Sequence, residues 1–241
     1  MSEKKPGEPV QVCQFFTSQW SVYDRLVKAN LLFHQELFGA LREDLLRITP
    51  NFSLLDLGCG DAGCLAKSLA GMRVSRCVAV DLAGGPILLA ARDNLRFRGI
   101  PAEVKQGDIL EFVEVLPKRK FDAVTLAYCL HHFPAADKAR FFQKVAQWVK
   151  PGGALWLLDE VIPNGLSREE WLRRELDLLH RLGAEALTPE EWDEVDQHII
   201  TGDFPETAEG YGEMARAAGF QTVETRLTVA EGLAAMIRFT R

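Results

Sequence analysis

The decapeptide LLDLGCGDAG at residues 54–63 ends a short apolar run and carries glycine at positions 58, 60 and 63. This G-x-G-x-x-G spacing is typical of a turn between a strand and a helix, where the backbone approaches a ligand closely. The amino end of the helix that follows favours negative charge. The stretch therefore predicts the nucleotide-binding edge of an α/β sheet. The glycines alone do not identify the adenosine-bearing cofactor, so the residues beside the turn have to indicate it.

Short apolar runs alternate with helical patterns along the first two thirds of the chain. The runs are FSLLDL (52–57), RCVAVDL (76–82), AEVKQ (102–106), FDAVTLAY (121–128) and ALWLLD (154–159). Between them, apolar residues recur every three or four positions over 64–72, 85–98 and 135–149. This alternation predicts right-handed βαβ crossovers and a parallel sheet that is covered on both faces.

The later part of the chain follows a different pattern. Two capping boxes, which start helices, are Ser167-x-x-Glu170 and Thr188-x-x-Glu191. A third helix is expected over 207–218, followed by two strands, GFQTVETRLT and LAAMIRFT. Because the stretch between these strands is too short to require a crossover helix, we expect them to be antiparallel.

These patterns predict a single α/β domain built on a doubly wound, mostly parallel, seven-stranded sheet with a C-terminal antiparallel strand. Its parts would be a flexible tail (1–12), an N-terminal helical segment (13–49), a cofactor-binding core (50–159), a helical cap insertion (160–205), and a last helix with a C-terminal β-hairpin (206–241).

Composition narrows the class of protein. With 241 residues and 47% apolar content, the chain can bury a sizeable core. A net charge of −6 argues against nucleic acid as a partner. Five cysteines without a C-x-x-C pair indicate neither a disulfide framework nor a zinc site, and we expect no metal.

Location and assembly are less constrained by the sequence. The N-terminus lacks the apolar region of a signal peptide, and no apolar run is long enough to cross a bilayer. We therefore expect a cytoplasmic protein with no membrane partner. The oligomeric state, monomer or homodimer, stays open.

Asp56, two residues before Gly58, separates the possible cofactors. A carboxylate repels the pyrophosphate of NAD and attracts cationic ligand groups. S-adenosylmethionine carries an ammonium and a sulfonium, together with one carboxylate that the N–H groups of the turn could hold. Asp56 therefore favours S-adenosylmethionine.

The stretch LLDLGCGDAG resembles the D/E-x-G-x-G motif of class I S-adenosylmethionine-dependent methyltransferases. Four further segments follow in the order that this family shows: VAVDLA (78–83), QGDI (106–109), FDAVTLAYCLHHF (121–133) and WVKPGGALWLLD (148–159). The resemblance covers roughly residues 50–160. It implies a Rossmann-like fold and methyl transfer by in-line displacement to a small-molecule acceptor, whose methylated atom, O, N or C, stays open, with S-adenosyl-L-homocysteine as product.

The resemblance also implies cofactor-binding residues. Asp81 would bind the ribose hydroxyls, and Asp108 would reach the adenine amino group, although both are also ordinary capping residues. Tyr23, in the segment Trp20-x-x-Tyr23-Asp24, would fold over the cofactor or simply belong to an amphipathic stripe. The full predicted set is Asp56, Gly58, Cys59, Gly60, Asp81, Leu82, Asp108, Ile109, Tyr23 and Ala127.

Candidate catalytic residues follow the fourth predicted strand. His131 and His132 would lie at the sheet edge where α/β proteins bind ligands. One of them, His132 by preference, would act as a general base toward the acceptor, or else either would bond the backbone and pack beneath the cofactor. Asp159 and Glu160 would cap the next element or orient a substrate amine or hydroxyl.

The acids of residues 190–209 are expected to form a solvated face, and Cys59 and Cys64 to be packing residues. Three other functions stay open. A non-methylating enzyme that uses S-adenosylmethionine would keep every motif. A NAD-dependent oxidoreductase would explain Asp81 but not Asp56, and a catalytically silent subunit would have lost its cofactor contacts.

Overall fold

The computed structural model describes residues 20–241. The expected flexible tail at 1–12 and the first residues of the N-terminal helical segment lie outside the described residues. Among the described residues, no helix combines the length and the hydropathy that crossing a membrane requires.

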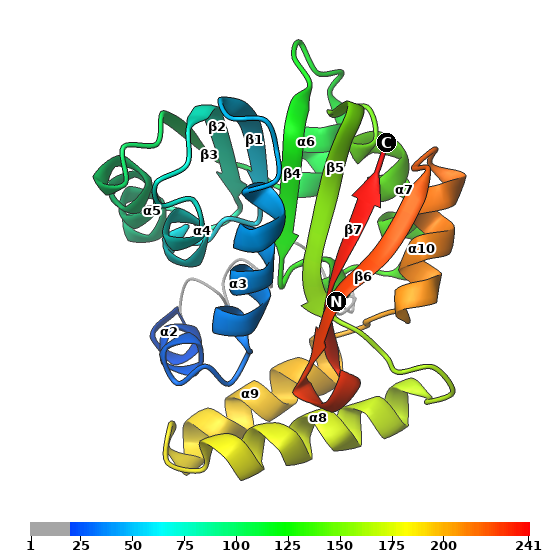
Figure 1. The fold of residues 1–241 in the computed structure, drawn as a ribbon. Coiled ribbons are helices and arrows are strands. Elements are labelled where there is room, and N and C mark those ends of the chain that lie inside the picture. The colour runs from blue at the N-terminus through cyan, green and yellow to red at the C-terminus, as the bar shows by residue number, and fades with distance from the viewer. Residues whose placement is uncertain (1–19) are drawn as a thin grey trace, which may run out of the picture.

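Seven strands form one sheet in the order β3-β2-β1-β4-β5-β7-β6 (Figure 1). They are β1 (Phe52–Leu57), β2 (Val74–Asp81), β3 (Ala102–Gln106), β4 (Phe121–Ala127), β5 (Val149–Glu160), β6 (Thr222–Val229) and β7 (Ala234–Thr240). The first five strands pair in parallel, and β7 runs antiparallel to both β5 and β6. The fold class is confirmed: a Rossmann-like, doubly wound, mostly parallel seven-stranded sheet with a C-terminal antiparallel strand.

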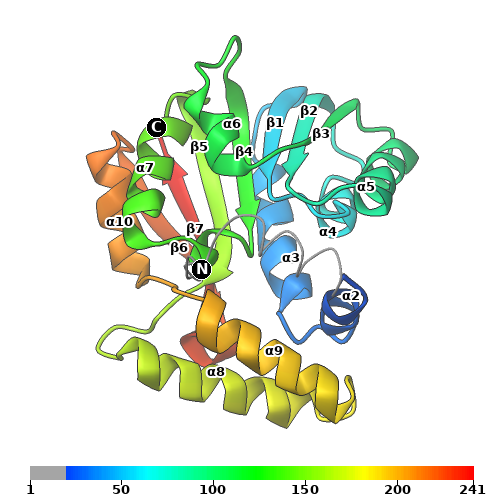
Figure 2. The same cartoon turned by 180° about the vertical axis from the view of Figure 1, so that it is seen from behind.

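Helices cover both faces of the sheet (Figures 1 and 2). One face packs against α3 (His34–Leu45), α4 (Gly63–Ser68) and α5 (Pro86–Phe97). The other packs against α6 (Ile109–Glu114), α7 (Ala135–Val145) and α10 (Ala208–Ala217). Along β1, Leu54 belongs to the first core and Leu55 to the second, because successive side chains of a strand point to opposite faces.

The helical cap lies beyond the carboxyl edge of the sheet, beside α2 (Trp20–Lys28) (Figure 1). It consists of α8 (Arg168–Gly183) and α9 (Pro189–Gly202). Both begin with the predicted capping boxes, in which Ser167 and Thr188 accept hydrogen bonds from the third residue of each helix. A third apolar core, which includes Leu26 and Trp171, joins α2 to the cap. The cap is thus anchored to the N-terminal helix.

Several element boundaries differ from the sequence-based expectation. β5 begins at Val149, five residues before the expected run 154–159, so Pro151, Gly152 and Gly153 lie inside the strand. Gly152 has a φ of 77°, and a Cβ on Gly153 would lie 2.7 Å from the carbonyl oxygen of Asp122. The two glycines allow an irregular start to the strand against β4. α4 and α7 end at Ser68 and Val145, earlier than expected.

Candidate active site

A cavity of about 780 Å³ opens at the carboxyl ends of β1 and β4, where the strand order reverses. Open α/β sheets bind ligands at this point, and the volume is in the range of cofactor pockets. Its wall includes six of the predicted cofactor residues: Tyr23, Asp56, Gly58, Cys59, Gly60 and Ala127. The predicted glycine turn and the N-terminal helix therefore meet at one cavity.

The glycine turn adopts a backbone conformation that side chains disfavour. Gly58 has a φ of 68° and Gly60 a φ of 50°. The amides of Gly58 and Cys59 donate to the carbonyl of Val80 at 2.8 and 3.1 Å, which ties the turn to β2. A Cβ on Gly60 would lie 3.2 Å from the Trp20 ring, so glycine also leaves room for α2 to approach.

Asp56 is buried, 5% exposed, and lies on the cavity wall. Its Oδ1 accepts a hydrogen bond of 2.7 Å from the Thr125 hydroxyl. Burial raises the pKa of Asp56 to about 7, against the opposing effect of the Thr125 hydrogen bond. A cation placed in the cavity would favour the ionised carboxylate. This geometry fits the electrostatic argument that the sequence suggested for Asp56.

Asp81 links the end of β2 to the glycine turn. Its carboxylate accepts hydrogen bonds of 2.7 Å from the amides of Gly60 and Ala83. Burial raises the pKa of Asp81, and these two hydrogen bonds oppose the rise. Asp81 adjoins the turn but is not on the cavity wall that the structure describes.

Asp108, Ile109 and Leu82 also lie off the described wall of this cavity. Asp108 caps α6, since its Oδ1 accepts from the amides of Leu110 and Glu111. Ile109 is buried in the core beside that helix. The geometry therefore shows the capping alternative for Asp108, and the cofactor roles of these residues stay predictions.

The two cysteines at the turn are poor nucleophiles. Burial raises the pKa of the Cys59 thiol well above its ordinary value and also raises that of Cys64. Because the thiolate is the reactive form, both side chains fit the packing role expected for them.

A second cavity, of about 70 Å³, shares Tyr23 with the first. The hydroxyl of Tyr23 lies 3.2 Å from Nε2 of His34, and the His34 ring stacks on Tyr128 with 4.8 Å between centroids. The polar residues on the wall of this second cavity are Tyr23, Tyr128, His131, His132, Glu160, His198 and Asp203. Residues of the sheet edge, of α2 and of the cap therefore line the second cavity.

The predicted histidine pair forms a short 3-10 helix, η1 (Leu130–His132), directly after β4. Asp159, at the end of β5, accepts hydrogen bonds from the amides of Leu130 and His131 at 3.0 and 3.2 Å. The same carboxylate accepts from Nδ1 of His131. Asp159 thus caps η1 and fixes the orientation of His131.

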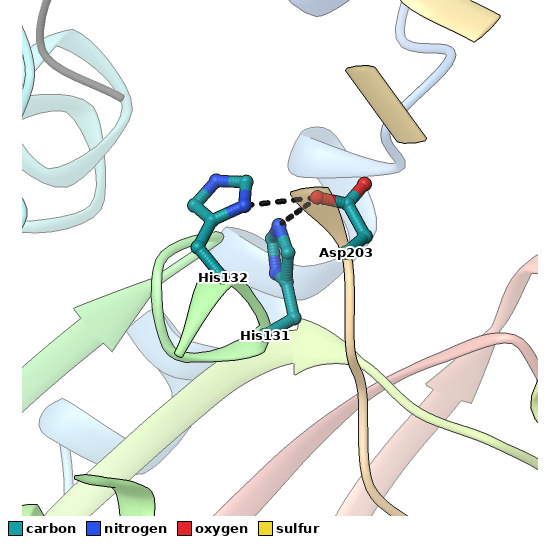
Figure 3. Close-up of side chains that lie close together, drawn as sticks. All are labelled: His131, His132 and Asp203. Atoms are coloured by element: carbon teal, nitrogen blue, oxygen red, sulfur yellow. Dashed lines mark hydrogen bonds and ion pairs between the residues drawn. The ribbon is translucent and has the colours of Figure 1, made fainter. Parts of the chain in front are cut away.

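Asp203 meets the histidine pair from the cap side (Figure 3). Its Oδ1 lies 2.9 Å from Nδ1 of His132 and 3.7 Å from Nε2 of His131. Asp203 is only 2% exposed, so the expected solvated face is wrong for this residue. It is buried because the amide of Phe204 donates to the carbonyl of His131 at 2.8 Å, which holds the chain after α9 against η1.

Burial and the surrounding charges shift the pKa values of His131 and His132 in opposite directions. Burial lowers the pKa of His131, but Glu160, Asp159 and Asp203 outweigh it and raise that pKa to about 10. Burial lowers the pKa of His132, and the charge on His131 lowers it further. Near neutral pH, His131 is therefore an imidazolium and His132 a neutral imidazole.

Sequence reasoning missed part of this site. Glu175 lies on α8 four residues after Trp171 and four before Leu179, two buried positions of the same helix face. An acid on an apolar helix face is a signal that could have identified it. His198 and Asp203 gave no such signal, since a polar residue near the end of an acidic helix is ordinarily exposed.

Comparison with known proteins gives the same fold. A family model described as a methyltransferase domain matches residues 54–153. The mitomycin 7-O-methyltransferase MmcR has a TM-score of 0.63 at 16% identity, covering 97% of this chain and 60% of that one. DhpI, in complex with S-adenosylhomocysteine, has a TM-score of 0.62 at 16% identity, covering 97% and 96%.

Curated relatives match part of the chain. The carboxy-S-adenosyl-L-methionine synthase of Yersinia enterocolitica is 29% identical over 127 residues, covering 52% of this chain and 46% of that protein. The ubiquinone/menaquinone biosynthesis C-methyltransferase UbiE of Vibrio vulnificus is 25% identical over 159 residues, covering 65% and 58%. The chain thus spans about half the length of these relatives.

The family match spans the glycine turn and the strands from β1 to the start of β5, and the similarity to these two solved structures extends over 97% of this chain. The motifs, the fold and the family model agree in indicating a class I S-adenosylmethionine-dependent methyltransferase domain that includes residues 54–153.

Proposed function

We propose that the protein binds S-adenosyl-L-methionine in the larger cavity and transfers its methyl group to a small-molecule acceptor in the smaller one, releasing S-adenosyl-L-homocysteine. The observation that carries this proposal is that Tyr23 lines both cavities. A cofactor-sized cavity beside the glycine turn and a small pocket with polar groups thus share one wall residue, which supports a donor site and an acceptor site on its two sides.

On the donor side, the Asp56 carboxylate would attract the ammonium of the cofactor, and Asp81 would hold the ribose beside the turn. The proteins named above include a carboxy-S-adenosyl-L-methionine synthase and DhpI in complex with S-adenosylhomocysteine. Asp108 would complete the proposed adenosine contacts. Ile109 and Leu82 would take part because they follow Asp108 and Asp81 in the chain.

The proposed reaction needs no covalent bond between a side chain and the methyl group. An electron pair of the acceptor O, N or C atom forms the bond to the methyl carbon as the carbon–sulfur bond breaks, and sulfur leaves as a neutral thioether. Where the acceptor atom bears a proton, that proton passes to a base or to solvent. The protein has to align the two reactants and exclude water. Tyr23 and the cap, which close the second cavity, are placed to do both.

On the acceptor side, a cavity of about 70 Å³ has room for only a few water-sized groups. We propose that His131, His132 and Glu160 bind and orient one polar group of the acceptor there. The role of His132 as a general base stays a prediction. A small-molecule partner, with neither nucleic acid nor membrane, and a cytoplasmic location are likewise proposed from the sequence alone.

We find no observation that favours the NAD-dependent oxidoreductase or the silent subunit. The buried Asp56 on the cavity wall disfavours a pyrophosphate. A non-methylating reaction of S-adenosylmethionine would use the same larger cavity, and the product distinguishes it from methyl transfer.

The proposal is tested by incubating the protein with S-adenosylmethionine and a panel of phenols, quinols, amines and carboxylic acids. Mass spectrometry then follows S-adenosylhomocysteine and an acceptor heavier by one methylene. Asp56→Asn serves as the control with a damaged donor site. Cofactor consumption that yields another adduct would replace methyl transfer by a non-methylating reaction.

A further inference from the structure

His131, His132 and Asp203 place three potential metal-ligand atoms within 4.8 Å of one another (Figure 3). Two residues come from η1 and the third from the segment after α9, so the cluster forms only when the cap lies against the sheet edge. The side chains of all three are at most 7% exposed. Solvent does not satisfy these groups, and they must satisfy one another or a ligand.

His131 is oriented as metal-binding histidines are. A carboxylate only accepts hydrogen bonds, so Nδ1 of His131 donates its proton to Asp159. The opposite nitrogen, Nε2, lies 3.7 Å from Oδ1 of Asp203, and a metal ion bound there would displace the proton that Nε2 carries in the imidazolium. A histidine that donates one N–H to a buried carboxylate and offers the other nitrogen is the usual arrangement beside a metal ion, because the carboxylate fixes the ring and its tautomer.

The spacing is close to that of a coordination sphere. Two ligands that bind one ion at about 2.0–2.1 Å lie roughly 2.9–3.4 Å apart, depending on the coordination angle. Here the distances to Oδ1 of Asp203 are 2.9 Å from His132 and 3.7 Å from His131. His198 reaches the same oxygen at 3.8 Å through its Nε2. The three ligand atoms all lie within 4.8 Å of one another, so the longer separations have to shorten when an ion binds.

Two buried carboxylates point independently to a cation. Glu160 is 5% and Glu175 6% exposed. Within the described part of the chain, Oε2 of each accepts no hydrogen bond. Glu160 lines the same cavity as the cluster, and Glu175 is near enough to Asp203 and His131 for their charges to act on it. Buried carboxylate oxygens without partners are costly unless a proton or a cation compensates them.

We propose that His131, His132 and Asp203 bind one divalent first-row transition-metal ion at the wall of the smaller cavity, with Glu160 facing it. Imidazole ligands favour ions such as Fe²⁺, Co²⁺ or Zn²⁺ over Mg²⁺ and Ca²⁺. Two histidines and one carboxylate leave coordination positions open for water or for an acceptor atom. Asp159 is a positioning residue, which acts through His131.

A metal ion at this place departs from the expectation, based on the sequence, that no metal binds. The sequence gives no motif for it, because His132 and Asp203 are 71 residues apart and no C-x-x-C or H-x-x-x-H pair accompanies them. In the metal-bound site Nδ1 of His132 would be a ligand atom, so this nitrogen would not act as the general base. The proposed metal site does not depend on the proposed methyl transfer.

The test uses the tag-free full chain, stripped of metal with a chelator and titrated with Co²⁺. Visible absorption reports coordination, and equilibrium dialysis with elemental analysis gives the stoichiometry. We expect one Co²⁺ per chain, with affinity lowered at least tenfold in His132→Ala and in Asp203→Asn. Asp159→Asn, which removes only the charge that orients His131, should weaken binding about 10–100-fold.

His180→Ala is the matched control. The His180 imidazole lies 2.9 Å from Asp196 on the cap, a histidine–carboxylate pair outside the cluster. Co²⁺ binding should be unchanged in this variant. Circular dichroism checks that each variant is folded, and if Asp203→Asn does not fold, His132→Ala decides.

Two outcomes would overturn the site: a folded wild-type chain that binds no Co²⁺, or binding that the cluster variants leave unaltered. Calorimetry with S-adenosylmethionine on the same samples keeps this result separate from the proposed methyl transfer, because cofactor binding without Co²⁺ binding refutes the metal site alone.

Discussion

At the scale of single residues, Asp56 has opposite effects on cofactor binding and on stability. Its pKa is about 7, and the ionised form is the one that attracts an ammonium. We therefore expect affinity for S-adenosylmethionine to rise as pH increases from about 5.5 to 7, below the range in which the α-amino group of the cofactor titrates. Isothermal calorimetry across this range, with Asp56→Asn in parallel, measures it. A variant that keeps the wild-type pH slope would exclude Asp56 as its source.

Stability of the cofactor-free protein should follow the reverse trend. The pKa of Asp56 rises from an ordinary 3.8 to about 7 on folding. Its contribution to stability is therefore fully present below 3.8 and lost as pH rises through about 7. Asp56→Asn removes this loss. Without cofactor, the variant should melt above wild type at pH 8 and show a smaller difference at pH 5, a trend that calorimetric melts can check.

Asp81 offers a third residue-level prediction. Losing a hydrogen bond to a charged group costs about 1–3 kcal/mol, so Asp81→Ala should weaken cofactor binding by roughly that amount. It should also lower the melting temperature, because Asp81 accepts from the amides of Gly60 and Ala83. Asp81→Asn keeps one acceptor oxygen and so can accept from only one of the two amides, and its melting temperature should lie between those of wild type and Asp81→Ala. Full affinity in a folded Asp81→Ala protein would remove the ribose assignment.

At the scale of elements, helix starts were more predictable than element ends. Both capping boxes of the cap were predicted correctly, because their residues lie three apart and bond within one turn. The start of β5 was misplaced because the irregular start of this strand, its bulge, depends on a contact with β4. Gly153 packs against the carbonyl of Asp122, which belongs to β4. Local patterns carry no information about such a neighbour.

The same two elements supply a stability prediction. Removing a capping hydroxyl costs about 1 kcal/mol, so Thr188→Ala should lower the free energy of unfolding by roughly that amount. Gly153→Ala should cost more, since a Cβ 2.7 Å from a backbone oxygen forces the strands apart. Urea unfolding of both variants measures this order. An unchanged Gly153→Ala protein would mean that the bulge relaxes freely.

At the scale of the whole molecule, the sheet and the larger cavity could be predicted, whereas the polar cluster could not. The cavity wall comes from short motifs that sit at strand ends, such as Asp56 and the glycine turn. The cluster depends on how the cap docks, which brings Asp203 and Glu175 to η1. Docking of this kind rests on many apolar contacts, including those of Trp171 and Leu26, that no motif encodes.

The most direct test of the central claim is a thermal melt of the purified protein with S-adenosylmethionine, S-adenosylhomocysteine or NAD. A ligand at about a hundredfold over its Kd adds roughly 2.7 kcal/mol to the native state, which raises the melting temperature of a domain of this size by several degrees. We predict this shift with both sulfur nucleosides and none with NAD. A shift with NAD alone, or with none of the three, would contradict the assignment of the larger cavity.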